Sequence, residues 1–194
     1  MKFTLKFFNE VQKTISKIED KKIEKIAKIL NALRTSKGRL FIMGVGGSSA
    51  NASHAVNDFR KLCNIETYCL TDNVSELTAR TNDEGWDSTF VGYLKNSNLK
   101  SKDILMIFSV GGGNLKKKVS MNIVKAMQYA SKKKIKTISI VGKNDGYAAK
   151  NSTISIIFDI ENKKLVTPIT ESLQVLIWHY LVSSPVLQKN STTW

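Results

Sequence analysis

The sequence predicts a three-layer α/β fold in which a doubly wound, mainly parallel sheet carries helices on both faces. Short apolar runs typical of strands alternate with helical spacing between Gly38 and Phe158. Glycine-rich turns directly follow three of these runs. With 194 residues, of which 42% are hydrophobic, the chain is long enough to bury one core of this type and lies within the usual length of one domain.

Residues 1–37 are expected to form two helices before any strand begins. Their apolar residues recur at helical spacing in two groups, which are separated near Asp20. The groups are Phe7, Val11, Ile15 and Ile18, and then Ile23, Ile26, Ile29, Leu30 and Leu33. These apolar faces either cover the chain's own sheet or pack against another subunit.

An α/β core is predicted for residues 38–184. The expected elements are a strand at 40–44, a helix to about residue 61, a strand at 66–70, helical turns at 75–80 and 86–95, a strand at 104–109, a helix at 121–132, strands at 137–141 and 154–158, and a last helix from about Pro168 that Pro185 ends. Residues 185–194 form a tail, and its part from residue 188 onward is expected to be loose. The chain, residues 1–194, is interpreted as a single domain.

The composition argues against several functional classes. The net charge is +14, but only four of the basic residues are arginines and no recognised nucleic-acid motif appears, so no nucleic-acid partner is expected. The lysine-rich surface can steer anionic substrates. No apolar run is long enough to span a bilayer, and charges interrupt the first ten residues too early for a signal peptide. We therefore expect a cytoplasmic protein without a membrane partner.

Two cysteines, Cys63 and Cys69, lie close together without a spacing typical of metal or redox sites. They are expected to be reduced and structural.

Ligands of such sheets bind beyond the carboxyl ends of the strands, where three loops fall, at residues 44–49, 109–114 and 142–146. In the first loop, glycines let backbone N–H groups approach a ligand. The helix that follows, with Ser48 and Ser49 as expected caps, favours an anion. The pattern predicts a phosphate cradle, although a turn of this kind also serves merely to pack a helix on a strand.

The chain has only two histidines, and each shares a helix face with a carboxylate. His54 and Asp58 are four residues apart, whereas Glu171 and His179 are eight apart. If the two helices face each other, they present two imidazoles and two carboxylates, a donor set suited to zinc or another divalent metal. The alternative is an ordinary surface pair on one helix and a histidine wedged between helices on the other.

The segment from Gly44 to Asp58, Gly-Val-Gly-Gly-Ser-Ser-Ala-Asn-Ala-Ser-His-Ala-Val-Asn-Asp, resembles the sugar isomerase (SIS) domain, and within it the phosphoheptose isomerases. The segment from Leu77 to Trp86 resembles the part that follows that family's second strand. The Ser109 loop falls where the family keeps its phosphate-binding serines, and Glu171 with His179 falls where it keeps its second pair of metal ligands. The resemblance covers about residues 4–184 and implies a flavodoxin-like SIS domain.

The resemblance implies an aldose–ketose isomerase that converts sedoheptulose 7-phosphate to D-glycero-D-manno-heptose 7-phosphate through an enediol. Asp58 is then the base and His179 the acid. The implied metal ligands are His54, Asp58, Glu171 and His179, with zinc as the implied ion and manganese or iron also suited. The implied substrate contacts are Gly46, Gly47, Ser48, Asn82, Asp83, Ser109, Gly111, Gly112, Gly113 and Asn114. A homotetramer with sites between subunits is also implied.

This chain departs from the family's pattern at positions that bear on the sugar. Val45 stands where the family has asparagine, and the phosphate loop is mostly glycine, so backbone N–H groups would hold the phosphate together with Ser109 and Asn114. Asp58 replaces a glutamate and reaches one C–C bond less far, and Glu171 replaces a glutamine. These changes affect which sugar is bound more than the class of reaction.

Two other functions fit parts of the sequence. A non-catalytic SIS-domain protein that binds sugar phosphates, or that is associated with a replication initiator, would need neither histidine. A nucleotide-binding enzyme could use Asp72 for a ribose. That function is disfavoured because Ser49 stands where the fingerprint G-x-G-x-x-G, read from Gly44, requires glycine.

Overall fold

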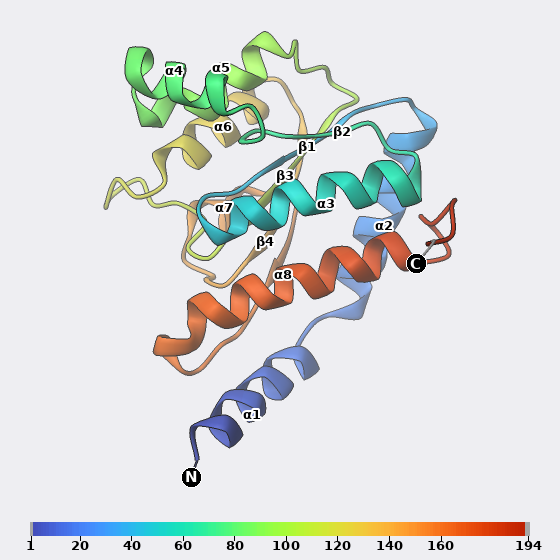
Figure 1. Cartoon of the computed structure of the whole chain (residues 1–194), viewed down its shortest axis with the longest axis vertical. Coiled ribbons are helices and arrows are strands. Elements are labelled where there is room, and N and C mark those ends of the chain that lie inside the picture. Colours follow the sequence, from blue (N-terminus) through green and yellow to red (C-terminus); the bar gives the residue numbers. More distant parts are fainter. Residues whose placement is uncertain (1, 193–194) are drawn as a thin grey trace.

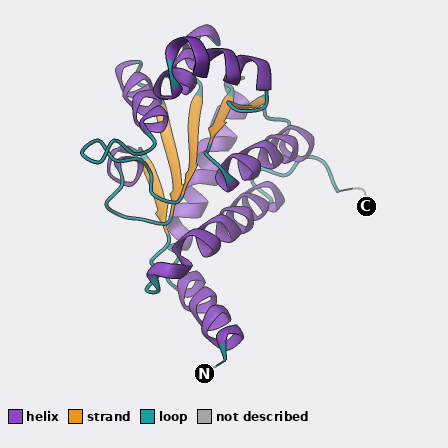
Figure 2. Ribbon diagram, turned by 60° about the vertical axis from the view of Figure 1, so that its left-hand side comes forward, coloured by secondary structure: helices purple, strands orange, loops and turns teal. Residues whose placement is uncertain are grey.

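The fold is built on one sheet of five strands, seen in a computed structural model that describes residues 2–192. The strands are β1 (Leu40–Met43), β2 (Thr67–Cys69), β3 (Ile104–Ser109), β4 (Lys136–Val141) and β5 (Ile154–Ile157). Their order across the sheet is β2-β1-β3-β4-β5, and all four pairings are parallel. Helices lie on both faces of this sheet, which confirms the predicted three-layer α/β class (Figure 2).

The two helical layers differ in their make-up. One face of the sheet is covered by α2 (Asp20–Thr35), α3 (Gly47–Cys63) and α8 (Val166–Ser183), and the other by α5 (Thr89–Asn96), α6 (Met121–Lys132) and α7 (Tyr147–Asn151) (Figure 1). The helix α4 (Val74–Glu84) and the short 3-10 helix η1 (Trp86–Ser88) pack against α5, and a second 3-10 helix, η2 (Lys163–Leu165), leads into α8.

Strand β3 shows why the sheet is buried on both faces. Successive side chains of a strand point to opposite sides, so Ile104, Met106 and Phe108 join the core beneath α3 and α8, whereas Leu105 and Ile107 join the core beneath α5 and α6. A strand covered on both sides needs an uninterrupted apolar run, and all six residues of β3 are buried.

The two predicted N-terminal helices are present but behave differently. Helix α2 contributes Ile26, Leu30 and Leu33 to the core. Helix α1 (Phe3–Ser16) projects from the body of the molecule (Figure 1) and leaves large apolar side chains in solvent. Phe3, at 71% exposed, and Phe8, at 63%, are the clearest examples. In the first predicted apolar face, Phe7, Val11 and Ile18 pack against the core and Ile15 is 41% exposed, so the most exposed apolar residues of α1 lie outside that face.

The end of the chain is held more firmly than expected. The backbone N–H groups of Lys189 and Asn190 donate to the carbonyl of Leu62 near the end of α3, and the Arg34 guanidinium donates to the carbonyl of Leu187. The expectation of a loose tail is therefore wrong as far as Asn190, because these groups satisfy carbonyls that the end of α3 leaves open. Residues 193 and 194 of the predicted tail lie outside the described residues.

No helix in residues 2–192 combines the length and apolar character needed to cross a membrane.

Candidate active site

The turn from β1 into α3 sets the position of the site. Gly46 has a φ of +64°, a conformation that glycine adopts at little cost, and it is the N-cap of α3. The expectation that Ser48 and Ser49 cap this helix is wrong, because no side chain caps it. Ser48 is instead buried, and its hydroxyl has no hydrogen-bond partner among the residues that the structure describes, whereas Ser49 shares a hydrogen bond with Thr71.

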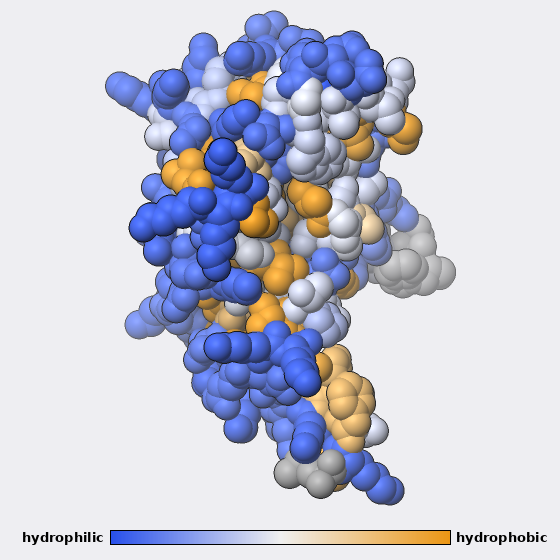
Figure 3. Space-filling model, turned by 90° about the vertical axis from the view of Figure 1, so that its left-hand side faces the viewer, coloured by the Kyte–Doolittle hydropathy of each residue, from blue (hydrophilic) through white to orange (hydrophobic). Residues whose placement is uncertain are grey.

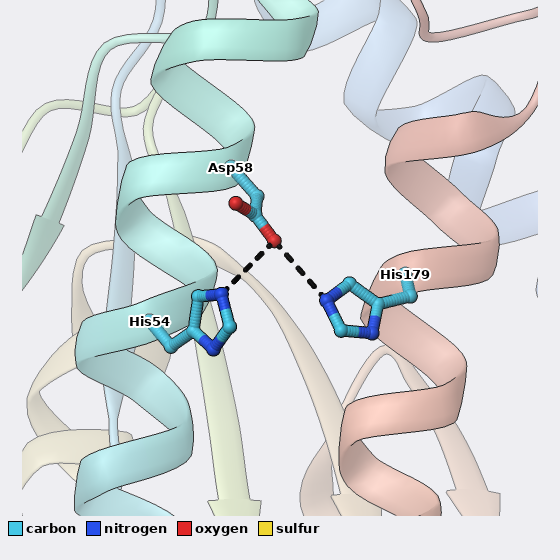
Figure 4. Close-up of side chains that lie close together, drawn as sticks. All are labelled: His54, Asp58 and His179. Atoms are coloured by element: carbon cyan, nitrogen blue, oxygen red, sulfur yellow. Dashed lines mark ion pairs between the residues drawn. The ribbon is translucent and has the colours of Figure 1, made fainter. Parts of the chain in front are cut away.

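Three of the four residues in the two predicted histidine–carboxylate pairs meet in one cluster. His54 and Asp58 extend from α3, and His179 extends from α8, which runs beside it (Figures 1 and 4). Asp58 Oδ2 lies 3.6 Å from His54 Nε2 and 3.4 Å from His179 Nε2. The side chain of Asp58 is 13% exposed, whereas those of the histidines are 57% and 48% exposed. One carboxylate thus lies at the base of the cluster with an imidazole on either side.

The donor atoms of this cluster fit a divalent metal. His54, Asp58 and His179 each offer one ligand atom, and these atoms all lie within 4.8 Å of one another. A tetrahedral ion with bonds of about 2.0–2.1 Å holds neighbouring ligand atoms about 3.3 Å apart. The distances of 3.6 Å and 3.4 Å from Asp58 Oδ2 are close to that spacing. Two imidazoles and a carboxylate are donors that zinc and its neighbours among the transition metals accept.

Hydrogen bonds hold the Asp58 carboxylate at both oxygens. The Trp178 indole N–H donates to Oδ2 at 3.1 Å, and the Asn57 amide donates to Oδ1 at 3.1 Å. Neither residue was predicted from the sequence. A signal did exist for Trp178, because it precedes His179 on the same helix and a buried indole N–H needs an acceptor.

The fourth predicted metal ligand, Glu171, lies apart from the other three. Its carboxylate rests against Gly47, where an added Cβ would come within 2.7 Å of both carboxylate oxygens. Gly47 is the first residue of α3, so this carboxylate lies at the positive end of that helix. Asn51 fixes this part of α8 by donating to the Glu171 carbonyl. Eight residues along a helix correspond to about 12 Å, so Glu171 reaches the cluster only if its side chain turns away from Gly47.

The predicted phosphate loop after β3 is a turn held by its own hydrogen bonds and by α7. The Ser109 hydroxyl accepts from the N–H of Gly112 at 2.9 Å, and Gly112 and Gly113 both have positive φ angles. The carbonyls of these two glycines accept from the first N–H groups of α7. Gly111 faces open space, since an added Cβ there would meet nothing within 4 Å. In the part of the chain that the structure describes, the N–H groups of Gly111 and Gly113 have no protein acceptor. Asn114 caps the rest of the loop by accepting from the N–H of Lys117.

The predicted substrate contacts on α4 lie in another part of the molecule. Asn82 and Asp83 are exposed, and the amide of Asn82 donates to the carboxylate of Asp83. Helix α4 has no buried residue and packs against α5 and η1, in the helical layer on the opposite face from α3 and α8. The structure therefore does not bring these two residues to the His54–Asp58–His179 cluster within one subunit.

The third predicted loop borders a separate cleft. A cleft of about 820 Å³ lies beside Gly142, Lys143 and Asp145, at the carboxyl ends of β4 and β5 and next to the α1–α2 turn. None of the predicted metal or substrate residues lines it. Its lining contains no histidine or cysteine.

The two cysteines are free and buried, as expected for structural residues. Burial raises the pKa of the Cys63 thiol to about 11, so this thiol stays protonated at neutral pH.

The comparisons with known proteins agree with this architecture. Residues 6–142 match the family model of the SIS domain, and the chain belongs to that family. The resemblance seen in the glycine segment is thereby confirmed.

Its relatives include named phosphoheptose isomerases. The chain is 30% identical over 179 residues to the phosphoheptose isomerase of Sulfurimonas denitrificans, a match that covers 89% of this chain and 86% of that protein. It is 32% identical over 152 residues to the lincomycin biosynthesis protein LmbN of Streptomyces lincolnensis, which is 74% of this chain but only 54% of that protein. The chain thus spans about half the length of this second relative. The solved structure of the phosphoheptose isomerase GmhA from Neisseria gonorrhoeae has the same fold, with a TM-score of 0.78 at 20% identity over 92% of this chain and 93% of that chain.

Proposed function

We propose that this protein is a phosphosugar isomerase that interconverts sedoheptulose 7-phosphate and D-glycero-D-manno-heptose 7-phosphate. The main support is the convergence of His54, Asp58 and His179 from two helices far apart in the sequence (Figure 4). The relatives named phosphoheptose isomerase support the choice of substrate. A family member that only binds sugar phosphates would need neither histidine, so the cluster favours catalysis over that alternative.

The isomerisation moves one proton between neighbouring carbons and others between the two oxygens. Asp58 is the proposed base at carbon, because its carboxylate is held by Trp178 and Asn57 and lies between the imidazoles. His179, half exposed beside it, is the proposed acid that moves protons at the substrate oxygens. A bound divalent ion, with zinc proposed, supplies electrophilic polarisation of the carbonyl.

Three residues would hold that ion in the arrangement described: His54, Asp58 and His179. Glu171 joins them in the proposed complete site by turning its side chain from Gly47 toward the cluster. In its present position the carboxylate covers the start of α3, where an anionic substrate group would otherwise be favoured.

The proposed phosphate site is the loop from Ser109 to Asn114. Its N–H groups at Gly111 and Gly113 have no acceptor within the described part of the chain, and the open face of Gly111 lets a phosphate oxygen approach the backbone. Ser109 keeps a hydroxyl proton to donate, since its oxygen acts as the acceptor for Gly112. A backbone cradle of this kind replaces the hydroxyl groups that this chain lacks.

A cytoplasmic homotetramer is the proposed assembly. Helix α1 presents Phe3, Leu5 and Phe8 to solvent, and Figure 3 shows apolar side chains on this projecting part of the surface. Exposed apolar residues on a projecting helix favour packing against another copy. The outward-facing histidines and the remote position of Asn82 and Asp83 agree with a site completed between subunits.

The test is turnover of a panel of sugar phosphates, followed as aldose–ketose exchange by NMR. We expect exchange with sedoheptulose 7-phosphate, its loss after chelation and its return with zinc. A protein that binds sugar phosphates equally well before and after chelation, without exchange in either state, would contradict the proposal.

A further inference from the structure

One aromatic side chain contacts every member of the cluster. Trp178 is fully buried, and its indole N–H donates to Asp58 Oδ2 at 3.1 Å. Its ring centroid lies 5.3 Å from that of His54, in an edge-to-face arrangement, and 4.9 Å from that of His179, whose ring is tilted against the indole. Trp178 therefore packs against the carboxylate and both imidazoles from the core side.

The indole ring of Trp178 packs in turn on a second aromatic side chain. Its ring is stacked on Phe108 with centroids 5.9 Å apart and an angle of 19° between the planes. Phe108 is in β3, directly before Ser109 and the proposed phosphate loop. This stack therefore ties the orientation of the indole to a strand that is buried on both faces.

We propose that Trp178 is a positioning residue that fixes the Asp58 carboxylate between the two imidazoles. The inference rests on the proposed function, because it assigns Trp178 a part in the same site. An indole N–H only donates and does not titrate near neutral pH, so it occupies Oδ2 from the core side. The outer side of that oxygen stays available to a metal ion or a substrate proton.

The shortness of Asp58 makes such an anchor necessary. An aspartate carries its carboxylate one methylene closer to the helix than a glutamate does, so it has less reach with which to correct a poor orientation. Asn57 holds Oδ1 and Trp178 holds Oδ2, and together they fix the plane of the carboxylate. Partners of this kind typically change metal affinity or activity by about 10-fold to 100-fold when they are removed.

The test replaces the donor and keeps the ring, with Trp178→Phe. We expect the dissociation constant of the chelator-treated protein for Zn²⁺ alone to rise about 10-fold to 100-fold. We also expect kcat with sedoheptulose 7-phosphate to fall by a similar factor, while KM stays within about twofold, because the phosphate loop is unchanged. The matched control is Trp86→Phe, in the helical layer on the opposite face of the sheet, which should leave Zn²⁺ affinity unchanged.

A spectroscopic measurement separates this inference from the proposed function. In ¹⁵N-labelled protein, the indole N–H resonance that is missing from Trp178→Phe belongs to Trp178. It should shift in Asp58→Asn, whereas the Trp86 resonance should not. If wild-type protein binds no Zn²⁺ and shows no exchange, the proposed function fails, and this resonance still decides whether Trp178 holds Asp58.

Two results would overturn the inference. One is a Trp178 resonance that is indifferent to Asp58→Asn. The other is a folded Trp178→Phe variant with wild-type Zn²⁺ affinity and wild-type kcat.

Discussion

The glycine-rich loops after β1 and β3 look alike in sequence but face different surroundings. In the first, the Glu171 carboxylate rests on Gly47 at the start of α3, so a negative charge already occupies the place that a helix N-terminus offers to an anion. In the second, Gly111 faces open space, and the N–H groups of Gly111 and Gly113 find no acceptor among residues 2–192. Glycines make both turns possible, but the neighbouring charge decides which of them can receive a phosphate. In the proposed function, the first loop starts the helix that carries His54 and Asp58, and the second loop binds the phosphate.

The largest expected effect comes from the helix that follows the first loop, because it carries the proposed base. Asp58→Asn removes the proposed base and one metal donor, so kcat should fall by about 100-fold to 10,000-fold. Steady-state kinetics with metal analysis measures both changes. The control is Asp159→Asn, an exposed carboxylate paired with Lys17, which should keep full activity. Full activity in Asp58→Asn would remove the cluster from the mechanism.

Gly111→Val tests phosphate binding at the second loop. A valine here enters open space at an ordinary φ, so the thermal unfolding temperature should stay near that of the wild type. Its side chain would cover the free N–H groups, and the loss of hydrogen bonds to a charged phosphate, about 1.5–3 kcal/mol, should raise KM about 10-fold to 100-fold with little change in kcat. An unchanged KM would place the phosphate elsewhere.

A substitution at Gly113 tests how tightly the second loop is packed. Gly113 has a φ of +79°, and an added Cβ would lie 2.7 Å from the Val124 side chain. Gly113→Ala should therefore lower the free energy of unfolding by about 1–3 kcal/mol. Urea denaturation of this variant beside Gly111→Val tests the contrast, since equal stability of the two would contradict it.

The smallest change in KM is expected from a substitution beside the first loop. Glu171→Gln removes the negative charge beside Gly47 and leaves the shape of the side chain. If the phosphate binds at the second loop, KM should change by no more than about threefold, because the lost charge lies beside the first loop and the glutamine keeps an amide oxygen for the proposed metal site. A much larger fall in KM, measured at constant ionic strength, would show that the first loop receives the phosphate.

The sequence was a better guide to the sheet than to the site. Strand β3 and helix α6 lie at their predicted bounds, because a strand buried on both faces is an unbroken apolar run and α6 has clear helical spacing. Helix α7 was not predicted, because five residues are too few to show a period.

The site depends on how two distant helices cross. Spacing along α3 and α8 placed His54, Asp58 and His179 on suitable faces, yet it paired His179 with Glu171, whereas in the structure His179 faces Asp58. The hydrogen bond from Trp178 to Asp58 could not be predicted for the same reason, since it exists only when α8 lies against α3. Periodicity within one helix carries no information about which residue of another helix lies opposite.

The position of α8 at the end of the chain also fixes the order in which the site is assembled. Asp58 and Trp178 are separated by 120 positions, and all five strands precede α8 in the sequence. A chain that is still being synthesised holds His54 and Asp58 before His179 exists, so it carries two of the three cluster residues. Contacts this distant in sequence form late in folding because of the entropy of closing the intervening loop. A metal ion or substrate that needs residues from both helices binds only chains in which α8 has docked on α3. Its binding therefore stabilises the α3–α8 contact in particular.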